Sequence, residues 1–320
     1  MHLQQGFQDP SCYRHGFVSI GNFDGVHFGH RGMISALVEK ASAGGVPSVV
    51  FTFDPHPITL LRPGSTPPPL STVRRKAQLI EQLGVDCMIV YPTDQELLDL
   101  SPREFFERII LQEIAASGMV EGPNFFFGRD RAGDIHKLHE YCDESGLDLK
   151  IVQPVNVGGR MVSSTAIRGL IATGNVCKAA ELLGHRYRIC GTVSQGAKRG
   201  AGIGFPTANL EGIPTVIPCD GVYAAIGILD DRQIPAAVNV GPNPTFGDHQ
   251  RKLEVHLIDF SGVLYGRTLE VEFVQRLRAT TSFAGIDQLK EQLSLDIAQA
   301  RTLAATAVGE IARPPGEAGG

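Results

Sequence analysis

The sequence of 320 residues predicts two kinds of fold in succession: a parallel, doubly wound α/β sheet, then a small antiparallel β-barrel or sandwich with a C-terminal helix. Up to about residue 185, short apolar runs alternate with amphipathic helical segments. Beyond that point, strand-like runs are separated by Gly, Pro and Asp. A long helical pattern, from Ile286 to about Val308, follows the last of these strands.

The first half has four apolar runs of the kind that is buried on both faces of a parallel sheet. We expect strands at FVSI (17–20), SVVFTF (48–53), CMIVY (87–91) and LKIV (149–152). We expect helices at 31–43, 72–83, 102–116 and 134–145. Each helix is followed by a glycine that we interpret as a stop signal, namely Gly44, Gly84, Gly118 and Gly146.

The second half alternates strands with turns. We expect strands at YRICGTVSQ (187–195), GVYAAIGIL (221–229), PAAVNVG (235–241), LEVHLIDF (253–260) and LEVEFVQRL (269–277). The connection at 172–185, ATGNVCKAAELLGH, has a helical composition and not that of a linker. We therefore predict domains at 1–185 and 186–311, followed by a disordered tail at 312–320.

Composition excludes several classes of partner. The net charge of −5 gives no general surface for polyanions, so nucleic acid is not expected. Six cysteines without a CxxC pair are typical of reduced thiols, which predicts a cytoplasmic protein. No apolar stretch reaches membrane-spanning length and the first ten residues lack a signal-peptide core, so no membrane partner is expected.

The stretch GNFDGVHFGH (21–30) joins the first predicted strand to the first predicted helix. Ligands bind beyond the carboxyl ends of strands in open α/β sheets, where a helix N-terminus favours anions. Gly21, Gly25 and Gly29 would let the backbone approach a phosphate, and His27 and His30 would lie on one helix face. Such donors suit phosphoryl or nucleotidyl transfer. A turn with surface histidines is the alternative, and a metal site lacks the HExxH spacing.

Three further stretches of the first half carry polar groups next to predicted elements. FTFDPHP (51–57) places Asp54 and His56 directly after a strand. GPNFFFGRDRAG (122–133) places Asn124 and an aromatic cluster between glycines, as a wall for a planar ring. SSTAIRGLI (163–171) has hydroxyl groups at a helix start with Arg168 one turn inside; these are either helix caps or a phosphate clamp.

Taken in order, these motifs resemble a known family. HxGH after the first strand is the hallmark of the nucleotidyltransferase superfamily, which implies a Rossmann-like fold for the first half. GNFDGVHFGH, FTFDPHP, GPNFFFG and SSTAIR together resemble the FMN adenylyltransferase domain of bacterial bifunctional riboflavin kinase/FAD synthetases. GIGFPTANL (202–210), NVGPNPTFG (239–247) and LEVHLIDF resemble the riboflavin kinase barrel of that family. The resemblance implies riboflavin, FMN, FAD and ATP as substrates and products, with Mg²⁺.

In the kinase half, Thr207 and Asn209 would point the same way if the chain is extended there, and their oxygens suit Mg²⁺. The resemblance assigns the metal to this pair, ATP to Gly204 and Pro206, and the role of catalytic base to Glu254. From alternation alone, Glu254 is equally an outward-facing strand residue, because Leu253, Val255 and Leu257 would share the opposite face.

In the adenylyltransferase half, the resemblance implies that the phosphate of FMN attacks the α-phosphorus of ATP. His27 and His30 would stabilise charge in the transition state, and Ser164, Thr165 and Arg168 would hold the leaving pyrophosphate. The further residues that the resemblance assigns to ATP are Gly21, Phe23, Asp24, Gly25 and Asn124, and those that it assigns to the flavin are Asp54, Phe125 and Phe127.

One residue departs from the family pattern, since Phe126 stands where many relatives carry a basic residue. Two other functions stay open at this point: a riboflavin kinase whose first half only binds nucleotide, and a non-catalytic flavin carrier. HFGH and Glu254 argue against both. A monomer or a weak homo-oligomer is expected.

Overall fold

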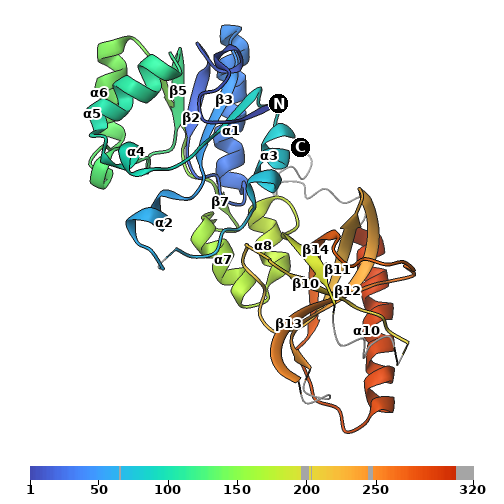
Figure 1. Cartoon of the computed structure of the whole chain (residues 1–320). Coiled ribbons are helices and arrows are strands. Elements are labelled where there is room, and N and C mark those ends of the chain that lie inside the picture. Colours follow the sequence, from blue (N-terminus) through green and yellow to red (C-terminus); the bar gives the residue numbers. More distant parts are fainter. Residues whose placement is uncertain (65, 196–201, 203, 244–247, 308–320) are drawn as a thin grey trace. The chain divides into compact units, whose positions relative to one another are not determined.

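The computed structural model describes residues 1–64, 66–195, 202, 204–243 and 248–307, which form two compact units (Figure 1). The first unit consists of Met1–Pro67 and Thr72–Val162. The second contains the short segment Pro68–Ser71 and the described residues from Ser163 onward. The predicted tail at 312–320 and the end of the last helix at Val308 lie outside the described residues.

The first unit is built on six parallel strands in the order β1-β4-β3-β2-β5-β6. The strands are β1 (His2–Gln5), β2 (Phe17–Ile20), β3 (Ser48–Phe53), β4 (Cys87–Tyr91), β5 (Gly118–Glu121) and β6 (Asp148–Ile151). A two-stranded hairpin, β7 (Asn156–Val157) and β8 (Arg160–Met161), follows. The doubly wound parallel sheet is therefore confirmed, and β1 and β5 are strands that the sequence did not predict.

Helices cover both faces of this sheet (Figure 1). They are α1 (Phe28–Gly44), α2 (Pro57–Leu61), α3 (Val73–Glu81), α4 (Gln95–Asp99), α5 (Pro102–Phe105), a π-helix (Phe106–Glu113) and α6 (Ile135–Ser145), with 3₁₀ turns at Pro10–Cys12 and Arg129–Arg131. Helices α1 and α3 pack with Val50 and Met88 on one face, and α5, the π-helix and α6 pack with Val49 and Ile89 on the other.

Gly118 does not end a helix, so that interpretation was wrong. The helical segment ends at Glu113, and Gly118 is the first residue of β5. A Cβ atom at Gly118 would lie 2.4 Å from the ring of Phe17 on the neighbouring strand. The glycine is therefore required by close packing between two strands and not by a helix terminus. Gly146, in contrast, is a left-handed helix cap with φ of 69°, as predicted.

The second unit contains two helices followed by a closed six-stranded barrel in the order β10-β13-β12-β11-β14-β9. Its elements are α7 (Ser164–Ala172), α8 (Val176–Leu183), β9 (Arg188–Ser194), β10 (Ala208–Glu211), β11 (Gly221–Leu229), β12 (Arg232–Asn243), β13 (Asp248–Leu257), β14 (Thr268–Arg278) and α10 (Ile286–Ala307). All pairings are antiparallel. The predicted barrel and the helical connection are confirmed, and β10 was not predicted.

Helix α10 packs on the outside of the barrel, against Ala224 of β11 and Ala237 of β12 through Ala300 (Figure 1). Helix α8 packs on β14, where the Cys177 thiol donates to the carbonyl of Val274 at 3.1 Å. All six cysteines are free thiols. Among the described residues, no helix is long and apolar enough to cross a membrane.

Candidate active sites

The loop between β2 and α1 has an unusual backbone. Phe23, Gly25 and Val26 have φ angles of 45°, 78° and 41°, in the left-handed region that β-branched and bulky residues rarely adopt. Phe23 is 1% exposed and Val26 is fully buried, so packing holds these two residues in place. Backbone strain of this kind costs on the order of 1–3 kcal/mol per residue and is concentrated at functional sites.

His27 ends this loop and is the N-cap of α1. Its Nδ1 atom accepts the backbone N–H of His30 at 3.4 Å, which places the ring proton of His27 on Nε2. The two imidazole rings stack with their centroids 3.6 Å apart. A Cβ atom at Gly29 would lie 3.3 Å from the His27 ring. Glycine between the histidines therefore makes room for His27 itself.

His30 is a neutral group at this site. Burial, His27 and the nearby cation of Lys76 together hold the pKa of His30 well below its usual value. Its Nδ1 atom is buried and has no hydrogen-bond partner among the described residues. His30 therefore offers a polar ring nitrogen to a ligand, but no positive charge at neutral pH.

Lys76 on α3 was not predicted as a site residue. It is 6% exposed, and its Nζ donates to Thr52 Oγ1 on β3 at 3.1 Å. Thr52 Oγ1 in turn donates to the carbonyl of Asn22 in the β2–α1 loop at 3.3 Å. Burial lowers the pKa of Lys76 to about 8 against the opposing effect of the Asp24 and Asp54 carboxylates. The sequence signal was present, because Val73, Lys76, Ala77 and Ile80 share one helix face.

Glu121 is a second buried group that sequence reasoning missed. It is the last residue of β5 and 1% exposed, and its Oε1 accepts the backbone N–H of Ile20 at 2.7 Å. The β2–β5 pairing stops at Val18 and Met119, so the side chain replaces the next backbone bond. Burial raises the pKa of Glu121 well above its usual value, which makes the carboxyl neutral. No functional signal in the sequence distinguishes Glu121 from other strand residues.

The other predicted residues of the first unit follow strand ends at the same edge of the sheet. Asp24 is buried next to the end of β2, Asp54 is exposed after β3, and Asn124 is exposed in a turn after β5. The rings of Phe125 and Phe127 stack at 5.4 Å. Phe127 is 5% exposed and packs in the core with Phe105 and Tyr141.

Ser164, Thr165 and Arg168 lie in the second unit, in the first turns of α7. The N-cap of α7 is Ser163, whose Oγ accepts the backbone N–H of Ala166 at 3.3 Å. Arg168 Nε donates to the carbonyl of Pro68 at 3.0 Å. The capping role that the sequence allowed therefore belongs to Ser163, while Ser164 and Thr165 occupy the first two helical positions.

A row of polar residues crosses four strands on the outer face of the barrel. Asn209 of β10 pairs with Glu254 of β13 and with Ser194 of β9, and Glu254 pairs with Asn239 of β12. Each is partly exposed, while the neighbouring Ala208, Leu210, Leu253, Val255, Val238 and Val240 are buried. The structure thus brings Asn209 and Glu254 together and adds Ser194 and Asn239, which sequence reasoning missed because strand register is not visible in it.

Thr207 and Asn209 flank the buried Ala208 on the exposed side of the chain. The start of this segment is tied to β13, since a ring nitrogen of His256 lies 2.8 Å from the carbonyl oxygen of Pro206. Gly204 has a φ of 94°, which only glycine adopts freely. The hydroxyl of Ser194 is buried without a hydrogen-bond partner among the described residues. Oxygen atoms from a hydroxyl, an amide and a carboxylate suit Mg²⁺ together with phosphate oxygens.

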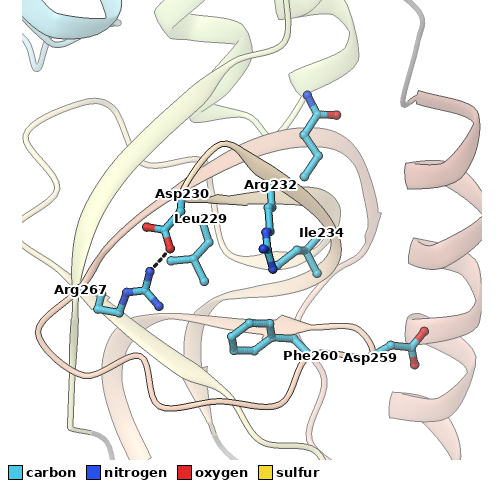
Figure 2. A pocket seen from close by; sticks show the side chains of 8 residues that line it. Leu229, Asp230, Arg232, Ile234, Asp259, Phe260 and Arg267 are labelled. Atoms are coloured by element: carbon cyan, nitrogen blue, oxygen red, sulfur yellow. Dashed lines mark hydrogen bonds and ion pairs between the residues drawn. The ribbon is translucent and has the colours of Figure 1, made fainter.

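A separate hollow of about 630 Å³ lies at the β11–β12 hairpin (Figure 2). Phe260 and Ile234 face it, and Arg267 forms an ion pair with Asp230 at its rim. None of the predicted site residues lines it. No cluster of three metal-ligating His, Cys, Asp or Glu side chains occurs in the described ranges.

Two family models match the chain, one for each half. The model described as FAD synthetase matches residues 9–166, and the model described as riboflavin kinase matches residues 183–304. The residues proposed from the HxGH, FDP and PNFFFG motifs fall in the first range, and Thr207, Asn209 and Glu254 fall in the second.

Curated relatives cover both halves together. The chain is 38% identical over 307 residues to the bifunctional riboflavin kinase/FMN adenylyltransferase of Pseudomonas fluorescens, covering 95% of this chain and 98% of that protein. It is 35% identical to the protein of the same description from Escherichia coli K12, covering 89% and 91%. A solved structure from Streptococcus pneumoniae, described as a macrolide-efflux protein, is similar with a TM-score of 0.83 at 30% identity, covering 94% of this chain and 99% of that one.

Proposed function

The chain belongs to the family of bifunctional riboflavin kinases/FMN adenylyltransferases, and from this premise we propose how its residues divide the two reactions. The enzyme phosphorylates riboflavin to FMN with ATP and adenylylates FMN to FAD with release of pyrophosphate. The observation that carries this function is the match of both family models, one after the other, along a single chain.

We propose that the polar row on the barrel is the kinase site. Glu254 accepts the proton of the ribityl 5′-hydroxyl as that oxygen attacks the γ-phosphorus of ATP. Gly204 and Pro206 contact the phosphates of ATP. The register supports this assignment, because it sets the carboxylate of Glu254 next to Asn209.

Thr207 and Asn209 are the residues that would hold Mg²⁺ at this site. When bound, Mg²⁺ neutralises charge on the β- and γ-phosphate oxygens. The sparse set of protein oxygens fits an ion that keeps several water and phosphate ligands.

We propose that the β2–α1 loop is the adenylylation site, with Gly21, Phe23, Asp24, Gly25 and Asn124 around ATP. One oxygen of the FMN phosphate bonds to the α-phosphorus of ATP, and the bond to the bridging oxygen of pyrophosphate breaks. His27 and His30 donate to the oxygens on which charge increases, and Ser164, Thr165 and Arg168 hold the leaving pyrophosphate. Asp54, Phe125 and Phe127 contact the flavin. The support is the buried, left-handed loop and the orphaned Nδ1 of His30.

We propose the domain boundaries 1–185 for adenylylation and 186–311 for the kinase. Helices α7 and α8 cluster with the barrel, which makes a start at Ser163 the alternative to test. We further propose a cytoplasmic enzyme that binds small molecules and no nucleic acid, as a monomer or weak homo-oligomer. The six free thiols support the cytoplasmic location, and the net charge of −5 supports the absence of a nucleic-acid partner.

The test is a coupled assay in which riboflavin and MgATP are supplied and FMN and FAD are separated by chromatography. A bifunctional enzyme forms FMN first and FAD later. A kinase with an inactive first half stops at FMN, and a flavin carrier forms neither.

A further inference from the structure

The adenylylation site contains a charged group that the motifs do not name. Lys76 comes from α3, a helix that carries none of the predicted site residues, and its side chain reaches the carboxyl end of β3. There it connects through Thr52 to the carbonyl of Asn22, within the GNFDG stretch. Its charge also acts on His30, whose pKa it lowers.

The hydrogen bonding of Lys76 is incomplete. An ammonium group has three N–H donors, and among the described residues only Thr52 accepts one of them. A buried ammonium with two unpaired donors is unfavourable, because the full desolvation of each donor is left uncompensated. Two other buried polar atoms that find no partner within the described ranges belong to the same loop and helix start, Asn22 Oδ1 and His30 Nδ1. These two atoms and the spare donors of Lys76, which is linked to the same loop through Thr52, indicate a polar ligand.

The ammonium group of Lys76 is the charge that an anionic ligand would pair with, while the Asp24 and Asp54 carboxylates act in the opposite sense and raise its pKa. The ionisable groups that act on or respond to Lys76 are Asp24 of the β2–α1 loop, Asp54 after β3 and His30 of α1. His27 stacks on His30 and caps α1 through its Nδ1 atom. Lys76 therefore supplies a positive charge next to the β2–α1 loop, where the neutral His30 supplies none.

We propose that Lys76 is a catalytic residue of adenylyl transfer, whose ammonium group donates to the non-bridging oxygens of the α-phosphoryl group of ATP. Lys76 keeps its proton throughout. The FMN phosphate oxygen forms the new bond to phosphorus, and the electron pair of the broken bond leaves with pyrophosphate. This inference rests on the proposed adenylylation site.

The first test replaces Lys76 with methionine, which keeps the length of the stem and removes the charge. We expect kcat for FAD formation from FMN and MgATP to fall about 100-fold or more, with KM for ATP changed by less than about threefold. Riboflavin kinase activity of the same chain is the internal reference. The matched control is Lys40→Met, since Lys40 is a half-exposed lysine of α1 that pairs with Asp148 at 2.5 Å. Retention of more than a third of wild-type kcat in Lys76→Met overturns the proposal.

The second test uses pH and does not depend on the methionine variant being folded. In the wild-type enzyme, kcat/KM for FMN should fall as pH rises above about 8, as Lys76 loses its proton. Lys76→Arg keeps its charge at every accessible pH, so its profile should lack this fall. If kcat/KM of Lys76→Arg falls above pH 8 as it does in the wild type, another group causes the fall and the proposal is overturned. A lysine with a purely structural role would give the same pH profile in both proteins.

A third variant separates this inference from the proposed function. His27→Asn combined with His30→Ala should abolish FAD formation if the loop is the site at all. Loss in the histidine variant with normal activity in Lys76→Met overturns the role of Lys76 alone. Normal activity in both overturns the site itself.

Discussion

The two proposed sites bring their side chains together in opposite ways. In the first unit, the groups sit in loops and helix starts beyond parallel strands, and burial determines their charge: His30 and Glu121 are neutral, and Lys76 has a pKa of about 8. In the barrel, the groups sit within strands, half exposed, and register sets Ser194, Asn209, Glu254 and Asn239 side by side. In the loop site, desolvation therefore sets the charge of the side chains, whereas in the strand site, strand register decides which side chains are neighbours.

The largest effect is expected at the strand site. Glu254→Gln keeps the shape of the side chain and its hydrogen bonding but removes the proton acceptor, so FMN formation should fall roughly 10²–10⁴-fold. Adenylylation of supplied FMN should be unaffected. Initial rates of both reactions measure this.

The matched control is Glu211→Gln, an exposed glutamate of β10 two residues beyond Asn209. A decrease in kinase activity of less than about tenfold in Glu254→Gln would leave Glu254 as an ordinary strand residue, because a general base contributes more than that.

The next effect is expected at the loop site. Replacing both His27 and His30 with alanine should reduce FAD formation on the order of a hundredfold or more, with FMN formation preserved. His27→Asn is the sharper single variant, since asparagine can still cap α1 and alanine cannot. His139→Ala, at an exposed histidine of α6, is the control. Near-normal FAD synthesis by the double variant would contradict the assignment.

Fragments test whether the two sites are physically separable. The fragments 186–311 and 163–311 should both convert riboflavin to FMN and make no FAD. The longer one should be more stable by about 4 kcal/mol or more, because Val176, Leu182 and Leu183 of α8 are buried. Urea unfolding of the two fragments measures the difference. A folded 163–311 fragment that makes no FMN would show that the kinase site needs the first half.

The smallest effect concerns the stability of the loop site. Glu121 is neutral in the folded state because burial raises its pKa, so its contribution to stability is present below the ordinary pKa of about 4.5 and is lost as pH rises through the folded value. Glu121→Gln should remove this loss and flatten the decline in the free energy of unfolding above pH 4.5.

Glu121→Ala should lower the free energy of unfolding by about 1–3 kcal/mol, since it leaves the Ile20 N–H without an acceptor. Thermal unfolding at several pH values distinguishes these outcomes; an unchanged pH dependence in Glu121→Gln would show that the carboxyl is ionised.

Much of the fold followed from the sequence because apolar runs and turn residues carry it. FVSI, SVVFTF and CMIVY read as buried strands and are β2, β3 and β4. β1 was missed because HLQQ is a polar edge strand, and β5 because GMVE is short and follows a continuous helical pattern. Gly118 was interpreted as a helix stop for the same reason, because a glycine that packs against an aromatic ring within a strand cannot be distinguished from a helix stop in the sequence.

The residues of the proposed sites could be found from the sequence only where they lie close together along the chain. His27 and His30 are one motif, and their placement at a strand-to-helix junction is confirmed. Asn239 and Ser194 join Glu254 and Asn209 through strand register, which no local pattern contains. Lys76 shows a third case, a charge on the apolar face of an amphipathic helix, which could have been found by asking what a buried ammonium needs.

Pro68–Ser71 belongs to the second unit although it is encoded within the first, and this order has a consequence during synthesis. Its partners appear late: the carbonyl of Pro68 accepts from Arg168, and that of Pro69 accepts from Val216 at 3.0 Å. During synthesis from the N-terminus, the parallel sheet is therefore completed while Pro68–Ser71 still lacks its partners from the second unit. The barrel closes only after Thr268–Arg278 has emerged to pair with both β9 and β11. During synthesis, the unit for the second reaction, adenylylation, can thus fold before the barrel for the first reaction, phosphorylation.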